Sequence, residues 1–208
     1  MEEYKKSLFI ISAPSGAGKT SLIQAITQSH DDFVLSISHT TRPMRPGESD
    51  GDDYFFITKA LFEQMIENND FAEYAKVFGN YYGTSLSLVQ SELEAGKDII
   101  LEIDWQGAMQ IKKERPDCIM LFLLPPSKEE LMSRLKKRGT DSKNEIQLRF
   151  NEALNDINQY SAFDKVFINK DVSSTVKEIT NFIGTAPNDD NSFSEEVKLI
   201  IETFRSSK

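Results

Sequence analysis

Short apolar runs alternate along the chain with longer segments in which apolar residues recur at helical spacing. The apolar runs predict strands buried on both faces, as in a parallel sheet, because they lack the alternating polar positions of a half-exposed strand. They span residues 8–11, 34–37, 99–103, 118–124 and 166–168. Strands and helices in alternation predict an α/β fold built on a doubly wound parallel sheet.

Capping residues between these runs mark where helices begin and end. One helix is predicted over residues 19–28, and another over residues 85–95 stops at Gly96, a residue type common just past helix ends. Two Ser-x-x-Glu sequences have the spacing of a capping box and predict two further helix starts. They are Ser127 to Glu130 and Ser142 to Glu145.

Three stretches interrupt this regular order. Residues 54–82 are rich in aromatics at period-two spacing, which predicts a small antiparallel lobe around a helix at 59–67. Residues 134–149 form a basic segment that favours two helices meeting at a flexible tip, and hence a moving flap. A linker-like stretch after residue 184 is followed by a short amphipathic helix over about 193–205.

Composition narrows the classes of protein to which the chain can belong. Its 208 residues favour one compact domain, and its 33 acids against 24 bases give a net charge of −9, which argues against a general nucleic-acid partner. The single cysteine, Cys118, cannot form an internal disulfide. No apolar segment is long enough to span a membrane, so we expect a cytoplasmic protein without a membrane partner.

The segment after the first predicted strand matches most of the sequence motif of a phosphate-binding loop. Gly18, Lys19 and Thr20 match the second half of the motif G-x-x-x-x-G-K-[ST], whereas Ala13 replaces its first glycine. We therefore expect Gly16 and Gly18, but not Ala13, to need unusual backbone freedom. Backbone N–H groups would surround the phosphates, Lys19 would reach the β and γ phosphates, and the Thr20 hydroxyl would ligate Mg²⁺.

A second anion site is indicated by Arg42 and Arg45, three residues apart in a proline-stiffened loop. Each guanidinium can bind a phosphate monoester with two hydrogen bonds, and Tyr54 and Tyr82 would add hydroxyl donors. Taken alone, the arginines are more often surface charge and the tyrosines more often packing residues.

A single carboxylate in a binding site can distinguish guanine from adenine. Guanine presents two adjacent donors, N1–H and its 2-amino group, whereas adenine presents an acceptor at N1. Glu73 lies in the aromatic lobe, while Glu102 and Asp104 follow a predicted strand at the edge of the sheet where ligands bind. Ser38 and Thr84 are candidates for guanine O6; for Glu73 alone, a solvent-facing position is the alternative.

With these residues in view, the chain resembles guanylate kinases of the bacterial type over residues 7 to about 182. The resemblance rests on the blocks SAPSGAGKT, SHTTRPMRPGE, DGDDYFF, FGNYYGTS, EIDWQGA and RLKKRGTDS. It implies a P-loop core at about 7–38, 84–133 and 160–183, a GMP-binding lobe at about 39–83 and a lid at about 134–159. The C-terminal helix at about 193–205 lies beyond the resemblance, and we expect it to belong to the same single domain.

The resemblance also implies roles for individual residues. ATP would bind residues Ala13, Pro14, Ser15, Gly16, Ala17, Gly18, Lys19, Thr20, Ser21, Arg134 and Asn169. GMP would bind Ser38, Arg42, Arg45, Tyr54, Glu73, Tyr82, Thr84, Glu102 and Asp104. Catalysis would use Lys19, Arg42 and the lid arginines Arg138 and Arg149, with Mg²⁺ held by Thr20 and by Asp104 through water.

The implied reaction moves the γ-phosphoryl group of ATP onto GMP, and onto dGMP, giving ADP and the diphosphate. Two alternatives stay open at this point: a non-catalytic guanylate-kinase-like module that binds proteins, and a P-loop kinase of another phosphorylated acceptor. An intact Gly18-Lys19-Thr20 argues against the first, and Glu73 with Ser38 and Thr84 argues against the second. The sequence leaves the oligomeric state open, including a homo-oligomer.

Overall fold

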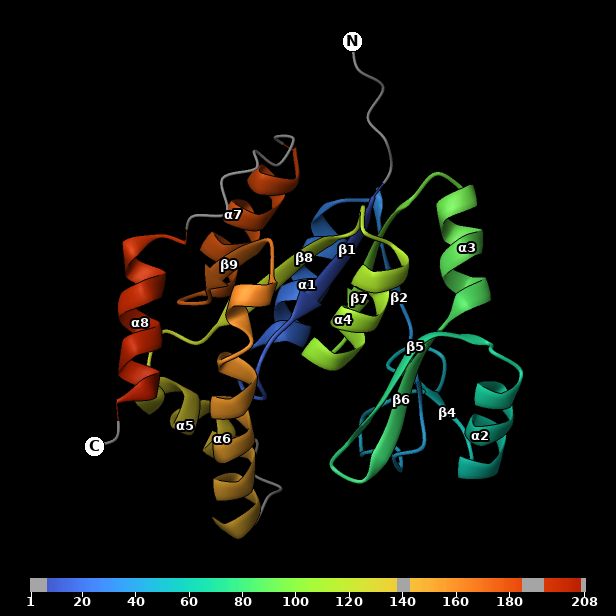
Figure 1. Cartoon of the computed structure of the whole chain (residues 1–208), viewed down its shortest axis with the longest axis horizontal. Coiled ribbons are helices and arrows are strands. Elements are labelled where there is room, and N and C mark those ends of the chain that lie inside the picture. Colours follow the sequence, from blue (N-terminus) through green and yellow to red (C-terminus); the bar gives the residue numbers. More distant parts are fainter. Residues whose placement is uncertain (1–6, 138–142, 185–192, 207–208) are drawn as a thin grey trace. The chain divides into compact units, whose positions relative to one another are not determined.

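The computed structural model describes residues 7–137, 143–184 and 193–206, and its chain divides into two compact units. The first unit comprises Met1–Ile10 and His30–Ile119, and the second comprises Ile11–Ser29 and Met120–Lys208. The boundary near the N-terminus falls inside strand β1 (Leu8–Ser12), whose residues are all buried. Figure 1 labels the elements of both units.

Part of the first unit consists of parallel strands with a helix packed against them. Strand β2 (Phe33–Ser36) runs parallel to β7 (Asp98–Glu102), and β7 also borders β1. Helix α3 (Leu86–Glu94) packs against β2 and β7, and helix α4 (Trp105–Glu114) follows β7 in the chain. Strand β7 is almost fully buried, as expected from the absence of polar residues between positions 99 and 101.

A small mixed sheet forms the rest of the first unit. Its order is β4-β3-β6-β5, with helix α2 (Lys59–Glu67) between β4 and β5 in the chain. The strands are β3 (His39–Thr40), β4 (Phe55–Phe56), β5 (Phe71–Val77) and β6 (Asn80–Ser85). The predicted antiparallel lobe is wrong in one pair: β3 and β4 are parallel, because the long connection over 41–54 lets the chain return in the same direction.

Strands and helices also alternate in the second unit. Strand β8 (Ile119–Leu124) runs parallel to β9 (Lys165–Ile168), and α1 (Lys19–Ser29) packs against α7 (Val172–Gly184). Helix α5 (Lys128–Lys137) packs against α6 (Lys143–Ile157), which is followed by the 3₁₀ turn η1 (Tyr160–Ala162). The parallel pairs of the two units, each accompanied by helices, confirm the predicted α/β class.

Of the two predicted capping boxes, only the first lies wholly within the described residues. Ser127 Oγ accepts a hydrogen bond of 3.2 Å from the Glu130 backbone N–H, which confirms the first capping box. The second box begins at Ser142, which lies outside the described residues, as do the flap tip at 138–142 and the linker-like stretch at 185–192.

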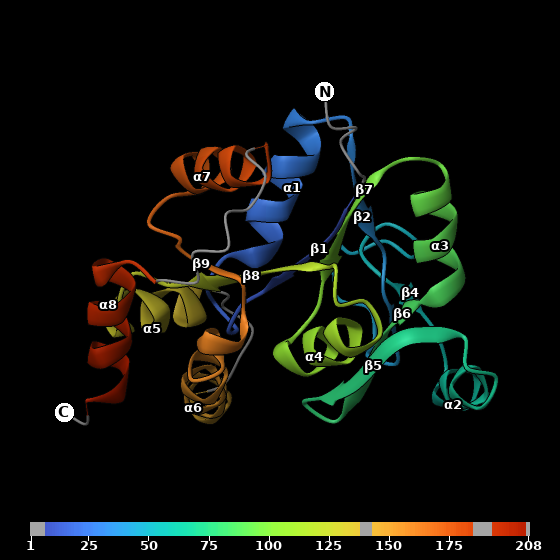
Figure 2. The same ribbon diagram turned by 45° about the horizontal axis from the view of Figure 1, so that its top comes forward.

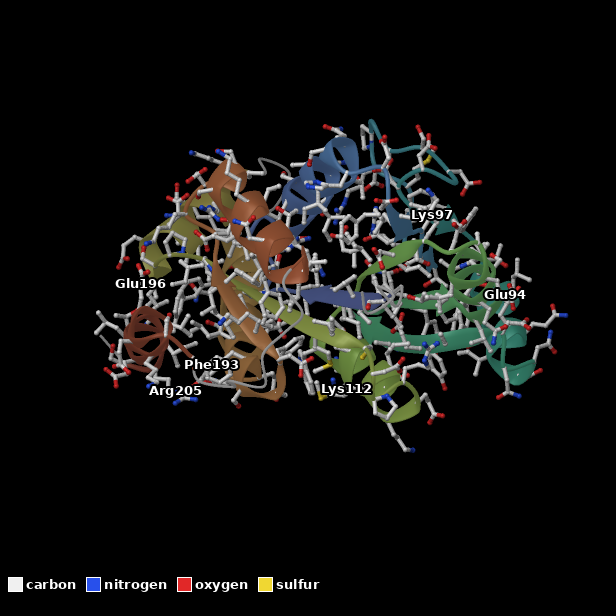
Figure 3. All side chains as sticks on the ribbon, turned by 90° about the horizontal axis from the view of Figure 1, so that it is seen from above. Glu94, Lys97, Lys112, Phe193, Glu196 and Arg205 are labelled. Carbon is white, nitrogen blue, oxygen red and sulfur yellow. The ribbon has the colours of Figure 1, made fainter. Side chains whose placement is uncertain are left out.

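Helix α8 (Glu195–Arg205) packs against α6 and β9, all within the second unit (Figure 1). Its apolar stripe is buried and consists of Val197, Ile200, Ile201 and Phe204. Polar contacts hold both of its ends: Lys170 pairs with Glu196 at 2.6 Å, and Arg205 Nε donates to Asn158 Oδ1 at 3.3 Å. The Tyr160 ring also contacts Phe193 and the Arg205 guanidinium, which are both labelled in Figure 3.

The helices of the described ranges are all too short or too polar to cross a lipid bilayer.

Truncation on α8 tests whether its buried stripe stabilises the fold. We expect Ile201→Ala to lower the free energy of unfolding by about 2–5 kcal/mol, because Ile201 is 1% exposed and its loss leaves a cavity. The matched control is Leu199→Ala on the same helix, which removes a side chain that is 62% exposed and should change stability by less than about 0.5 kcal/mol. Urea denaturation measures both, and equal effects would contradict the docking of α8.

Candidate functional site

The predicted phosphate loop joins β1 to α1 in the second unit. Gly16 and Gly18 both have a φ of +90°, whereas Ala13 has no positive φ, as the sequence predicts. A Cβ on Gly16 would lie 3.1 Å from side-chain carbons of Leu131 and Leu135, so the loop also lies close against α5. The two glycines therefore provide both the bend and the space for it.

Asn169 and Arg134 hold one backbone carbonyl of this loop. The Ala17 carbonyl accepts hydrogen bonds from Asn169 Nδ2 at 2.7 Å and from the Arg134 guanidinium at 3.1 Å. Because the carbonyl and the N–H of a trans peptide point in opposite directions, these bonds turn the Gly18 N–H away from both side chains. The structure thus brings both predicted ATP-binding residues to the loop backbone.

A short network positions the two side chains that hold the loop. Arg134 also donates to the Asn169 carbonyl at 3.0 Å and to Glu130 Oε1 at 2.8 Å, within α5. Asn169 is 2% exposed, and a Cβ on Gly18 would lie only 2.6 Å from its Nδ2. A side chain at position 18 would therefore displace the amide that orients the loop.

The remaining predicted residues of the second unit lie on helices. Lys19, Thr20 and Ser21 form the first turn of α1, with Lys19 half-buried and Thr20 and Ser21 exposed. Arg149 is half-buried on α6, whereas Arg138 lies outside the described residues.

Arg42 lies in the first unit and is bound by an acid that the sequence analysis did not single out. Its guanidinium donates two hydrogen bonds of 2.9 Å to the two carboxylate oxygens of Glu48. Glu48 also accepts a bond of 2.7 Å from the Arg45 backbone N–H, so it fixes the loop that carries both arginines. The Arg45 side chain is exposed. A signal was present in the sequence, since Glu48 follows Arg45 by three residues across the turn Pro46-Gly47.

The pair Arg42–Glu48 is charged at neutral pH. Burial opposes the charge of Arg42, but the bond and the attraction to Glu48 outweigh it and raise the pKa of Arg42 above its usual value. The hydrogen bond from Arg42 in turn lowers the pKa of Glu48. A phosphate that approaches Arg42 must therefore share or replace an existing carboxylate partner.

Aromatic rings surround the same guanidinium. The Arg42 Cζ lies 5.3 Å from the centre of the Tyr54 ring and 5.5 Å from that of Phe56. Tyr54 contacts Tyr82 edge to face, with ring centres 5.9 Å apart. Burial, and secondarily the negative charge of Glu102, raise the pKa of Tyr54 to about 12. Tyr54 therefore keeps its proton and remains a hydrogen-bond donor at neutral pH.

The acid predicted to choose the base is buried. Glu73 on β5 is 4% exposed and lies opposite Thr84 on β6, whose hydroxyl donates to Glu73 Oε1 at 2.6 Å. The alternative of a solvent-facing Glu73 is therefore wrong, because the β5–β6 pairing turns this face toward the interior. Ser38, also proposed for the base, is 8% exposed.

Two further predicted acids lie where β7 meets α4. Glu102 is the last residue of β7, and Asp104 caps α4 by accepting a hydrogen bond of 2.9 Å from the Gly107 N–H. One Asp104 oxygen is thus engaged in the fold. Within the ranges that the structure describes, no cluster of three or more His, Cys, Asp or Glu side chains could hold a metal ion.

Comparison with known proteins agrees with this arrangement. The family model for guanylate kinase matches residues 5–186. A guanylate kinase of Photorhabdus laumondii is 50% identical over 179 residues, which cover 85% of this chain and 86% of that protein. The chain belongs to the guanylate kinase family. A guanylate kinase of Hydrogenovibrio crunogenus is 51% identical over 173 residues, 83% of this chain and 84% of the relative.

A solved structure extends the match beyond the segment that defines the guanylate kinase family. The crystal structure of guanylate kinase from Anaplasma phagocytophilum has a TM-score of 0.76 and 26% identity, with all of both chains covered. Helix α8 begins after residue 186, where the family model ends, so its packing on the second unit was not evident from the family motifs.

Removal of the Asn169 amide tests the network that orients the loop of this guanylate kinase family member. We expect Asn169→Ala to lower the free energy of unfolding by about 1–3 kcal/mol, because the Ala17 carbonyl and buried neighbours lose hydrogen bonds. It should also weaken the binding of ATP, the ligand expected from the sequence, in a titration. Asn155→Ala, at an exposed position of α6, is the control; similar losses in both variants would show that the network is unimportant.

Alkaline unfolding tests the environment of Tyr54. Its pKa is raised in the folded state, so its contribution to stability is complete below pH ~10 and is lost as the pH rises toward 12. We expect Tyr54→Phe to make stability fall less steeply over this interval, while Tyr74→Phe, at an exposed position, leaves the slope unchanged. Chemical denaturation at a series of pH values measures the slope; no difference between the variants would contradict the shifted pKa.

Proposed function

We propose that this member of the guanylate kinase family transfers the γ-phosphoryl group of ATP to GMP, producing ADP and GDP. The observation that carries the proposal is the buried carboxylate of Glu73, with Thr84 at 2.6 Å. A buried carboxylate needs hydrogen-bond donors, and guanine supplies two adjacent ones. Adenine would place an acceptor against the same oxygens, and a sugar has no such edge.

The acceptor phosphate is assigned to Arg42, Arg45, Tyr54 and Tyr82. Arg42 already makes a fork-shaped pair with Glu48, which is the geometry in which a guanidinium binds phosphate oxygens. The Tyr54 hydroxyl remains protonated, so it can donate to a dianionic phosphate. We include dGMP as a substrate, since the residues assigned here address the base and the phosphate rather than the ribose.

The triphosphate is assigned to the loop of the second unit. Its glycines and the orientation of the Ala17 peptide suit backbone N–H groups that surround phosphate oxygens at the start of α1. Lys19 would contact the β and γ phosphates. Arg134 and Asn169 keep their assignment to ATP, in addition to the structural bonds that they make.

Mg²⁺ is the cofactor that we propose for this phosphoryl transfer. The exposed Thr20 hydroxyl at the loop's end is a hard oxygen donor, and Asp104 would act through a water with the oxygen that does not cap α4. Mg²⁺ in kinases is held mainly by phosphates and water, so a dedicated cage of carboxylates is not required. When bound, the ion neutralises charge on the transferring phosphate.

The reaction needs no side-chain nucleophile, because the attacking oxygen belongs to the GMP phosphate and is ionised at neutral pH. Catalysis then consists of alignment and of charge stabilisation by Lys19, Arg42, Arg138 and Arg149. We assign the two last arginines to a lid that closes over the phosphates and excludes water. The proposal includes a division into core, GMP-binding lobe and lid. It also assigns the protein to purine nucleotide metabolism in the cytoplasm.

A coupled assay with ATP and each of GMP, AMP, CMP and UMP tests this proposal. We expect strong preference for GMP, and we expect Glu73→Gln to raise the KM for GMP by about 10- to 100-fold, because an amide NH₂ then faces one guanine donor. The KM for ATP should not change. Glu94→Gln, at an exposed position of α3, is the control with the same chemical change.

One outcome would overturn the proposed reaction, and another would overturn only the assignment of Glu73. If the wild-type chain phosphorylated none of the four nucleotides, the assigned reaction would be wrong. If Glu73→Gln left the KM for GMP unchanged, the reaction would stand but the assignment of base recognition to Glu73 would fail.

A further inference from the structure

Gly107 lies in the first turn of α4, which packs against β5, the strand that carries Glu73 (Figure 2). Its N–H donates to the capping residue Asp104 at 2.9 Å, and Gly107 itself is buried. Its φ is not positive, so the backbone here suits any L-residue. Conformational freedom therefore does not explain the glycine.

The lack of room for a side chain does explain why residue 107 is a glycine. A Cβ placed on Gly107 would overlap Glu73 Oε2 and would lie 3.0 Å from Glu73 Cδ. The carboxylate cannot readily withdraw, because Glu73 is buried and its other oxygen accepts the Thr84 hydroxyl. The same Cβ would lie 3.4 Å from Ile103 Cδ1, an ordinary contact, so the conflict is with the carboxylate alone.

Helix propensity makes this choice of residue informative. Alanine is the most favourable residue in a helix interior, and glycine is among the least favourable. Glycine at this place gives up helix stability, and the carboxylate occupies the volume that a methyl group would fill.

We propose that Gly107 is a positioning residue for base selection: by lacking a side chain, it lets Glu73 hold its carboxylate where guanine is recognised. The inference rests on the proposed function, because it takes Glu73 as the group that binds the guanine edge. Gly107 contacts no reacting atom and acts through Glu73.

The test compares Gly107→Ala in two backgrounds, wild type and Glu73→Ala. With Glu73 present, we expect the kcat/KM for GMP to fall at least about tenfold through a higher KM, with the KM for ATP unchanged. In the Glu73→Ala background the carboxylate is gone, so the same change should alter the kcat/KM for GMP by less than about twofold. Gln106→Ala, at the exposed neighbouring position of the same helical turn, is the control.

Thermal unfolding of the same four proteins keeps the inference testable even if Gly107→Ala is too unstable to assay. We expect Gly107→Ala to lower the melting temperature with Glu73 present. In the Glu73→Ala background, where helix propensity acts alone, it should leave the melting temperature unchanged or raise it. An equal effect of Gly107→Ala in both backgrounds, in kinetics or in melting, would overturn the inference. Absence of GMP phosphorylation by the wild-type chain would overturn the proposed function instead.

Discussion

The buried carboxylate of Glu73 is the constraint on which the first unit's candidate site depends. A carboxylate that is 4% exposed is tolerated only where hydrogen bonds and nearby positive partial charges replace water. The β5–β6 pairing supplies the Thr84 hydroxyl, and the packing of α4 on β5 brings a helix start toward the other oxygen. Strand register, helix placement and a glycine are thus all tied to one buried carboxyl group.

The triphosphate site proposed for the second unit depends on backbone groups instead of a buried carboxyl group. Its loop presents backbone N–H groups, which every residue except proline carries, so their directions depend on the conformation of the backbone. Asn169 and Arg134 orient the peptide between Ala17 and Gly18 by donating hydrogen bonds to the Ala17 carbonyl. Glu130 in turn accepts a hydrogen bond from Arg134. The chemistry of the phosphate loop therefore extends to side chains more than a hundred residues away, on α5 and after β9. A preorganised loop of this kind loses little conformational entropy when a ligand binds.

Arg42 is a positively charged side chain in a protein whose net charge is negative. With a net charge of −9, the protein can attract phosphates only where cations are concentrated, yet Arg42 is already paired with Glu48. The pair keeps the guanidinium charged, oriented and partly desolvated between aromatic rings. Glu48 thus orients Arg42, and it would compete with the proposed phosphate for the same hydrogen bonds.

The sequence by itself determined the elements whose signals are local. Apolar runs predicted the strands of the parallel pairs, the box at Ser127 predicted the start of α5, and the motif around Lys19 predicted which glycines take a positive φ. Helices α4 and α7 were not predicted. Only the tertiary structure decided that β3 and β4 are parallel and that Gly107 makes room for Glu73. Local patterns reflect periodicity and backbone sterics, whereas these contacts depend on how distant segments pack, which no spacing along the chain specifies.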